Sequence, residues 1–282
     1  MFAFLLGVMV GDAAKAHSLQ EDGHRLPSTN LRLDLTKRFE HSERFGEYTA
    51  MCYNAIGLKM YRVKDSPPDS RQLKSPAKPG KYNWNSERSP LVAWIFNNCL
   101  GLDFSENTTT TPVKMEWIFN TSREFRIAFL QGVAESDGHV TYAGTIMIVS
   151  FPNVDFFVRL MRSVGVECWT QKVGGKERVV CTSVKRASTI NLFNERIFSI
   201  RYLRMMKIAN ADRMRGSWPG YLEDDIVRLS VYSSIPAITK YLLDTYNVYK
   251  EPGTLRKHML RRGIVPIPGR GRPKNGVRLA KV

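Results

Sequence analysis

The sequence predicts an α+β fold built from two similar halves, followed by a small helical module. A nine-residue, largely apolar pattern with an aspartate at its eighth position occurs twice, at residues 5–13 and 130–138. The two acids are 125 residues apart, about the size of a small domain, which favours an internal duplication. The predicted boundaries are 1–110 for the first half, 111–218 for the second half, 219–263 for the helical module and 264–282 for a basic tail.

The second copy of the pattern predicts a helix that ends at Asp137. One face of this helix collects the residues that recur at steps of three and four, namely Phe125, Ala128, Phe129, Gly132, Val133 and Ser136. Gly132 and Ser136 lie one turn apart, and small residues at this spacing let another backbone come close. Gly138 is a natural stop residue. Because the C-terminal end of a helix is negative, Asp137 is unfavourable there, and a bound cation would compensate.

The first copy, residues 5–13 (LLGVMVGDA), repeats this spacing. Gly7 lies five residues before Asp12, as Gly132 lies five residues before Asp137. If the two helices pack side by side, their final acids come together. Two carboxylates at a close seam form an oxygen-ligand site for Mg²⁺. The plainer interpretation is two ordinary buried amphipathic helices, and the double occurrence and the paired acids weigh against it.

These stretches resemble the motif of the LAGLIDADG homing endonuclease family, over roughly residues 1–215. The copy at 130–138 (LQGVAESDG) matches well, whereas the first copy matches more loosely and ends on Ala13 instead of glycine. The resemblance implies two αββαββα halves whose motif helices form the interface and whose antiparallel sheets form a saddle over DNA. It also implies that Asp12 and Asp137 are catalytic and hold Mg²⁺, with Ala13 and Gly138 beside them in the metal site.

The first half contains the expected order of elements. Residues 30–37 alternate apolar and polar side chains, with Leu31, Leu33 and Leu35 on one face, which predicts a strand. The other predicted elements are a helix from Phe39 to Ile56, strands from Lys59 to Lys64 and from Lys81 to Asn85, and a helix from Pro90 to Leu100. The stretches 66–80 and 101–112 are predicted loops, the second of which links the halves.

The second half repeats this order. A hairpin is predicted around Gly144, with strands at 139–143 and 145–151, followed by a helix that Asn153 caps and that runs to Val164. A second hairpin is predicted around Gly174-Gly175, with strands at 167–173 and 177–184. A final helix over 187–198 would match the helix at 90–100.

Basic residues on these strands are predicted to line the DNA face, although a merely solvated sheet surface would look similar. They are Arg32, Lys37, Lys59, Arg62, Lys172, Arg178 and Lys185. Lys185 ends the last predicted strand, and the family resemblance implies a lysine near the catalytic centre in this region. The matching position in the first half is Glu87, which makes the halves unequal. Lys37, at the end of a strand of the first half, is the second candidate for a catalytic lysine.

Composition points to a polyanionic partner. The net charge is +16, and nucleic acid is the commonest polyanion, although a ribosome-associated protein would share this charge. The four cysteines form no C-x-x-C pair, so zinc is not indicated and a reducing compartment fits. The apolar residues 1–10 are too short to span a membrane. We expect a protein of the cytoplasm, associated with the nucleoid, or of an organelle in a eukaryote.

The sequence of the C-terminal module predicts a second DNA-binding region. After a helical bridge at 201–218, short helices are predicted at 224–232, 235–246 and 251–262. This layout suits a helix-turn-helix whose third helix reads DNA through Arg256, Lys257 and Arg261, although a helical hairpin packed on the core is the alternative.

The basic tail resembles an AT-hook around Gly271-Arg272-Pro273. Glycine and proline keep such a backbone narrow, and Arg270 and Arg272 would reach into an A·T minor groove. A disordered basic tail is the alternative, and either version binds the phosphate backbone.

The resemblance and the charge together predict a monomeric, two-motif homing endonuclease that needs Mg²⁺. Its product would be a double-strand break with short 3′ overhangs at a long asymmetric site in double-stranded DNA. Two alternatives stay open. One is an RNA maturase, whose partner would be intron RNA, and the other is a LAGLIDADG-derived transcription regulator that does not cleave.

Overall fold

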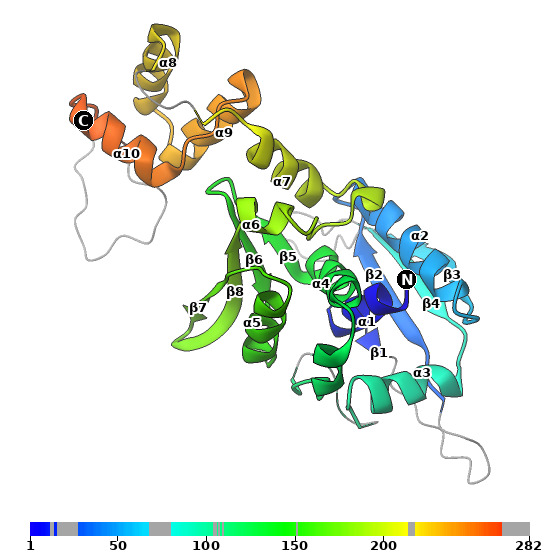
Figure 1. The fold of residues 1–282 in the computed structure, drawn as a ribbon. Coiled ribbons are helices and arrows are strands. Elements are labelled where there is room, and N and C mark those ends of the chain that lie inside the picture. Colours follow the sequence, from blue (N-terminus) through cyan, green and yellow to red (C-terminus); the bar gives the residue numbers. More distant parts are fainter. Residues whose placement is uncertain are drawn as a thin grey trace. The chain divides into compact units, whose positions relative to one another are not determined.

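The chain is α+β and forms two compact units (Figure 1). The computed structural model describes residues 1–11, 14–15, 28–67, 80–103, 106, 108, 110–150, 152–213 and 218–266. The first unit comprises residues 1–140 and 145–206, and the second comprises 141–144 and 207–282. The first predicted half lies within the first unit, whereas the second predicted half also includes residues 141–144 and 207–218 of the second unit.

The elements of the two halves follow each other in the same order. The first half contains α1 (Phe2–Val10), β1 (Ala14–Lys15), β2 (Leu31–Thr36), α2 (His41–Asn54), β3 (Met60–Ser66), β4 (Lys81–Ser86), α3 (Pro90–Trp94) and a π-helical turn η1 (Ile95–Cys99). The second contains a 3₁₀ turn η2 (Glu116–Asn120), α4 (Arg123–Asp137), β5 (Gly138–Val140), β6 (Thr145–Val149), α5 (Val154–Ser163), β7 (Trp169–Val173), β8 (Lys176–Ser183), α6 (Val184–Ser188), a second 3₁₀ turn η3 (Glu195–Ile197) and α7 (Ile200–Asn210).

Each half contributes one four-stranded antiparallel sheet, and the two sheets have the same topology. Their strand orders are β1-β2-β4-β3 and β5-β6-β8-β7. The registers break at the same place, after Val63 in the first sheet and after Gln171 in the second. This agreement confirms the predicted α+β fold of two similar halves with antiparallel sheets.

Helices cover one face of each sheet. In the first sheet, Leu33 pairs with Trp84, and Trp84 lies so close to Gly46 of α2 that a Cβ at Gly46 would come 2.1 Å from its indole nitrogen. In the second sheet, α4 packs on β5 and β6, and Ile148 and Val180 are buried. Side chains alternate along a strand, so the neighbouring positions form what we call the outer face of each sheet.

A segment distant in sequence contacts the start of the second helix of each half. The amide of Val113, which follows the first half, donates to Oδ1 of Asn153 at the start of α5 over 2.9 Å. The amide of Ile200 donates to Nδ1 of His41 at the start of α2 over 3.4 Å. Asn153 was predicted to cap its own helix. It does occupy the N-cap position, but the described contact of its side-chain oxygen is with Val113.

Some predicted elements differ from the structure. The helix expected over 187–198 is wrong: α6 ends at Ser188, and Asn191 and Phe198 adopt left-handed backbone angles (φ 46° and 45°) that interrupt a helix. The matching stretch at 90–100 is only partly α-helical, because it continues as η1. The two-residue strand β1 was not predicted.

Beyond the end of α7, the described part of the second unit holds three helices, α8 (Gly220–Ser230), α9 (Ile235–Tyr246) and α10 (Pro252–Arg261). They share a small apolar core that includes Leu222, Ile226, Ile238, Leu242, Leu255 and Met259. Asp225 accepts hydrogen bonds from Tyr241 (2.9 Å) and Tyr246 (2.6 Å), which ties α8 to α9. Within the described residues, no helix has the length and apolar character needed to cross a membrane.

Candidate active site at the seam of α1 and α4

The motif helices α1 and α4 pack against each other through a pair of glycines. A Cβ added to Gly7 would lie 2.1 Å from the carbonyl oxygen of Phe129 and 2.9 Å from the Cα of Gly132. A Cβ added to Gly132 would lie 2.1 Å from the carbonyl oxygen of Phe4 and 3.0 Å from the Cα of Gly7. The contacts are reciprocal, as a two-fold relation between the halves requires. No side chain larger than hydrogen fits at either position.

The same seam continues to the ends of both helices. A Cβ at Gly11 would lie 2.4 Å from the Cβ of Ser136 and 3.5 Å from Oδ2 of Asp137. The Ser136 hydroxyl bonds back to the carbonyl oxygen of Gly132 over 3.0 Å, so it stays within its own helix. The chain that leads into Asp12 therefore lies beside the Asp137 carboxylate. Asp12 and Ala13 themselves lie outside the described residues.

Gly138 is needed for a different reason from the one predicted. Its backbone is extended (φ −80°, ψ 151°), so it is not a left-handed helix stop. A Cβ there would lie 2.3 Å from the carbonyl oxygen of Ala134 and 3.0 Å from the Phe193 ring. The helix thus turns directly into β5, and Asp137 is held at the junction between helix and sheet, where its side chain is half-buried.

Glu135, one residue before Ser136, was not predicted as part of the site. It is 2% exposed, and its Oε1 accepts hydrogen bonds from the amide of Asn194 (2.9 Å) and the hydroxyl of Ser199 (3.2 Å). Its Oε2 is buried without a hydrogen-bond partner. Burial raises the pKa of Glu135 to about 7, although Arg201 and these hydrogen bonds oppose the shift. The aligned residue of the first copy is Val10, so the sequence repeat gave no signal for it.

The two predicted catalytic lysines differ in their surroundings. Lys185 is exposed in the first turn of α6, because β8 ends two residues earlier, at Ser183, and not at Lys185 as predicted. Lys37 lies in the turn after β2, and its Nζ is 2.7 Å from Oδ2 of Asp65 and 5.0 Å from the Tyr82 ring. The structure gives Lys37 a partner in its own half.

The predicted DNA-binding residues of the first sheet lie on both of its faces. Arg32 is exposed on the outer face, with its Nε 2.9 Å from Oδ1 of Asp34. Lys59 precedes β3 and is exposed, 3.5 Å from Glu87. Arg62 pairs in register with Trp84, on the face that α2 covers.

Arg62 is occupied by contacts within the fold. Its guanidinium pairs with Glu43 of α2 and with Asp65 (2.9 Å), and it lies 4.8 Å from the Tyr82 ring. Hydrogen bonds from Arg62 and then Lys37 lower the pKa of Asp65 to about 2. These contacts make Arg62 part of the packing of α2 on the sheet, and it does not join Arg32 on the outer face.

The remaining predicted contacts are distributed over three regions. Lys172 is exposed near the β7–β8 turn, whereas Arg178 shares the helix-covered face of β8 with Val180. On α10, Leu255 and Met259 are buried in the helical core, and Arg256, Lys257 and Arg261 are exposed. Arg270 and Arg272 lie outside the described residues.

The residues at the seam fit a hard divalent cation. Carboxylate and carbonyl oxygens are the ligands that Mg²⁺ and Ca²⁺ prefer, and the seam brings the Asp137 carboxylate to the point where the chain enters Asp12. Among the described residues no group of three or more His, Cys, Asp or Glu side chains could hold a metal. Cations held here would therefore depend on the two motif acids together with backbone, water or phosphate oxygens.

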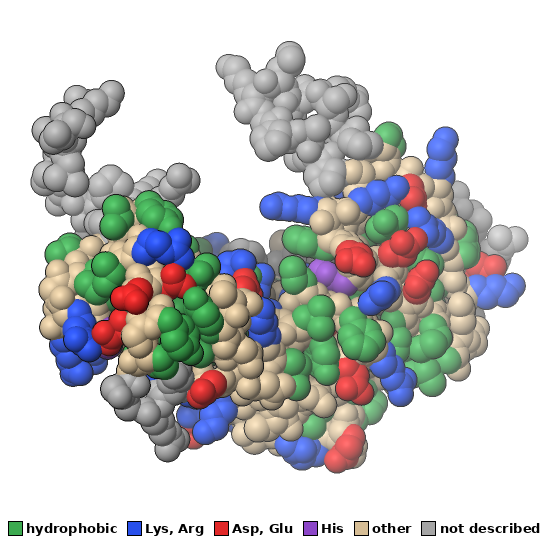
Figure 2. All heavy atoms as spheres, turned by 90° about the horizontal axis from the view of Figure 1, so that it is seen from above, with side chains coloured by type: hydrophobic (Ala, Val, Ile, Leu, Met, Phe, Trp, Pro, Cys, Tyr) green, Lys and Arg blue, Asp and Glu red, His purple; other side chains and the backbone are tan. Residues whose placement is uncertain are grey.

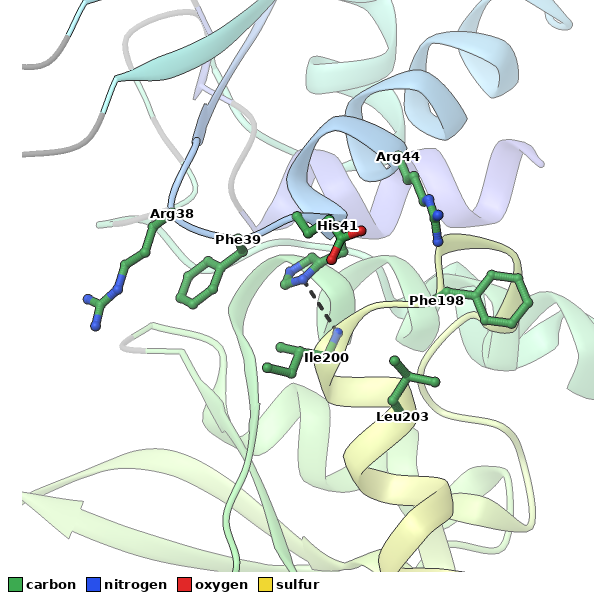
Figure 3. Close-up of a pocket in the computed structure, with 8 residues that line it drawn as sticks. Arg38, Phe39, His41, Arg44, Phe198, Ile200 and Leu203 are labelled. Carbon is green, nitrogen blue, oxygen red and sulfur yellow. Dashed lines mark hydrogen bonds between the residues drawn. The ribbon is translucent and has the colours of Figure 1, made fainter. Parts of the chain in front are cut away.

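A pocket of about 470 Å³ lies elsewhere on the first unit, between the start of α2 and the start of α7 (Figure 3). Phe39, His41, Ile200 and Leu203 line it together with Arg38 and Arg44, and none of the predicted site residues does. Figure 2 shows one face of the molecule, on which basic, acidic and apolar side chains are interspersed. The excess of positive charge is therefore not gathered into a single patch on that face.

No protein-family model matches this sequence, and no curated protein matches it. Several solved structures are similar to it. The crystal structure of I-DmoI in complex with DNA and Mn is 16% identical, covers 68% of this chain and 94% of that chain, and has a TM-score of 0.44. The homing endonuclease I-WcaI bound to its DNA recognition sequence is 12% identical, with coverages of 72% and 84% and a TM-score of 0.48.

The N-terminal LAGLIDADG domain of DUF199/WhiA is also similar, at 15% identity, coverages of 72% and 87%, and a TM-score of 0.40. These neighbours are LAGLIDADG homing endonucleases and a LAGLIDADG domain, the family that the motif residues resemble. Since all three TM-scores are below 0.5, we base the function on the residues and geometry of this chain alone.

Proposed function

We propose that the chain is a monomeric, site-specific DNA endonuclease that makes a double-strand break at a long asymmetric target. The observation that carries this proposal is the reciprocal packing of Gly7 and Gly132, because it fixes the ends of both motif helices at one seam. A nuclease that cuts both strands within one chain needs two similar half-sites meeting at one centre. The shared topology of the two sheets supports that arrangement.

The proposed roles of the residues follow from their positions. Asp137, together with Asp12, would bind the divalent cation, for which we propose Mg²⁺, with Ala13 and Gly138 contributing to the site. When bound there, the cation would stabilise the attacking and leaving oxygens of an in-line phosphodiester displacement. The close backbone packing at the glycine seam would hold the ends of the two helices, and with them the two acids, near each other.

The basic residues would supply the attraction for DNA. Lys59 beside the first sheet, Lys172 on the second, and Arg256, Lys257 and Arg261 on α10 are exposed and would contact phosphates. Arg32, exposed on the outer face of the first sheet, would contact base edges. Lys185, exposed at the start of α6, is our candidate for a lysine that stabilises charge during cleavage.

The test compares cleavage with binding. Full-length protein is offered a randomised library of double-stranded DNA, bound sequences are recovered, and one of them is incubated with protein in Mg²⁺. We expect cleavage by the wild type, loss of at least a hundredfold in Asp12→Asn and in Asp137→Asn, and nearly unchanged binding of both variants in a gel shift with Ca²⁺. Full cleavage by either variant would contradict the metal-site proposal.

A further inference from the structure

The outer face of the second sheet is chemically unlike that of the first. In the first sheet, the outer positions are mostly polar or charged: Arg32, Asp34, Tyr61, Lys81, Asn83 and Asn85. In the second, the pairs His139–Met147, Met147–Cys181, Val149–Val179, Trp169–Cys181 and Gln171–Val179 place mostly apolar side chains there. The two faces occupy equivalent places in two sheets of the same topology.

This apolar face is open to a ligand on both sides of β8. Val149 on β6 is 40% exposed and Trp169 on β7 is 44% exposed, whereas Cys181 and Val179 on the strand between them are 1% and 3% exposed. The Cys181 thiol lies 3.8 Å from Oε1 of Gln171, which confirms that their side chains share one face. The face is therefore a shallow apolar surface with exposed flanks and one amide.

We propose that this outer face reads thymine methyl groups, so that the half of the DNA target bound by the second sheet is rich in A·T pairs. This inference rests on the proposed function. In the major groove only an A·T pair presents a methyl group, and apolar side chains discriminate it through contact. A glutamine pairs best with adenine, so Gln171 fits the same half-site.

The position of this face and the charges beside it favour DNA as its ligand. The face begins at β5, which starts directly after Asp137, and so it adjoins the proposed cleavage centre. Exposed Lys172 and Lys176, at the β7–β8 turn, border it with positive charge, as a phosphate backbone requires. The equivalent face of the first sheet carries Arg32 and Asn85, which suit hydrogen bonds to base edges instead.

The first step of the test finds the target and orients it. Bound sequences are selected from a randomised double-stranded library by the full-length wild type and by Val149→Asn. Val149 is exposed, so this variant is expected to keep its melting temperature. We expect one A·T-rich half in the wild-type target and a changed preference in that half only for Val149→Asn.

The second step replaces thymine by uracil, which lacks the methyl group and keeps the base pairing. Each contacted methyl removed from the A·T-rich half should weaken binding roughly fourfold, as for one buried methyl group. The same replacement in the other half should leave binding unchanged. The matched control is Arg32→Ala, which should alter preference in the other half and keep the sensitivity to uracil.

Each outcome has a distinct consequence. Binding and cleavage of a selected target without loss on uracil replacement would overturn this inference and leave the endonuclease proposal standing. A chain that enriches no sequence would overturn both. A protein dimer that Val149→Asn dissociates would overturn the inference and assign this face to a second copy of the chain.

Discussion

The two halves of the first unit share a backbone plan and differ in the side chains that they present. Both have the same strand order, a register break at the same place and a glycine at the α1–α4 seam. Their outer faces are polar in one half and apolar in the other, and the start of the second helix is held through His41 in one half and Asn153 in the other. The strand order and the glycine seam are alike in the two halves, whereas the outer faces and the contact at the start of the second helix differ.

Substitutions at the glycine seam between α1 and α4 are expected to have the largest effect on stability and cleavage. Gly132→Ala and Gly7→Ala each place a methyl group about 2 Å from a carbonyl oxygen, so the helices must separate. We expect each variant to lose roughly 3 kcal/mol or more of unfolding free energy, at or above the upper end of overpacking effects, and to lose cleavage.

The matched control is Gly253→Ala in α10, where a Cβ meets no atom within 4 Å. This variant should melt within a degree or two of the wild type. Thermal unfolding followed by circular dichroism measures all three proteins. Wild-type melting of both seam variants would mean that the halves do not meet at these glycines.

Two buried titratable side chains, His41 in the first half and Glu135 in the second, predict opposing pH effects. His41 accepts a hydrogen bond through Nδ1, and burial, with the charge of Arg201, lowers its pKa to about 4 from 6.5. Since the unfolded chain takes up this proton first, stability due to His41 falls as the pH drops from 6.5 to about 4. Glu135, with its pKa raised from 4.5 to about 7, has the opposite sign: its contribution falls as the pH rises through that range.

We therefore expect nearly constant wild-type stability between pH 4.5 and 6.5, and two variants with opposite slopes. His41→Gln should lose stability as the pH rises, and Glu135→Gln should lose it as the pH falls, each by about 1–3 kcal/mol over the range. Urea unfolding at several pH values gives these slopes. Parallel slopes in the two variants would contradict the assigned protonation states.

Substitutions of two arginines of the first half distinguish a residue that stabilises the fold from one that binds DNA. Arg62→Ala removes ion pairs with Glu43 and Asp65 and should lower stability by about 1 kcal/mol with little change in DNA affinity. Arg32→Ala should weaken DNA binding several-fold with an unchanged melting temperature. Fluorescence anisotropy on the selected DNA, beside thermal melting, distinguishes the two. The reverse pattern would place Arg62 in the DNA interface.

The smallest expected effect is that of the tail. Ile264 packs on the helical core of the second unit, so the deletion should begin at residue 267. Removing 267–282 should weaken DNA binding several-fold through lost phosphate contacts and leave the position of the cut unchanged, because the sheets supply the specificity. Mapping the cut on end-labelled DNA checks this, and a moved cut would show that the tail reads sequence.

The sequence predicted the seam because glycine spacing is a local signal that both copies repeat. It could not predict the face of Arg62, because Tyr61 and Val63 beside it are the more apolar residues and suggest that Arg62 points outward. Glu43 of α2 and the rings of Tyr82 and Trp84 favour the opposite face, and such partners are distant in sequence. Glu135 was missed for the same reason. The groups that donate hydrogen bonds to its buried carboxylate, the amide of Asn194 and the hydroxyl of Ser199, are about 60 residues away in the sequence.

The claim that the two motif acids form one metal site is tested most directly by Mn²⁺ binding. Full-length protein is bound to its selected DNA, and Mn²⁺ bound to the complex is measured by electron paramagnetic resonance in the wild type, Asp12→Asn and Asp137→Asn. We expect Mn²⁺ affinity to fall by at least tenfold in each single variant, because each removes a carboxylate from the same site. Wild-type Mn²⁺ affinity in either variant would contradict a site shared across the seam.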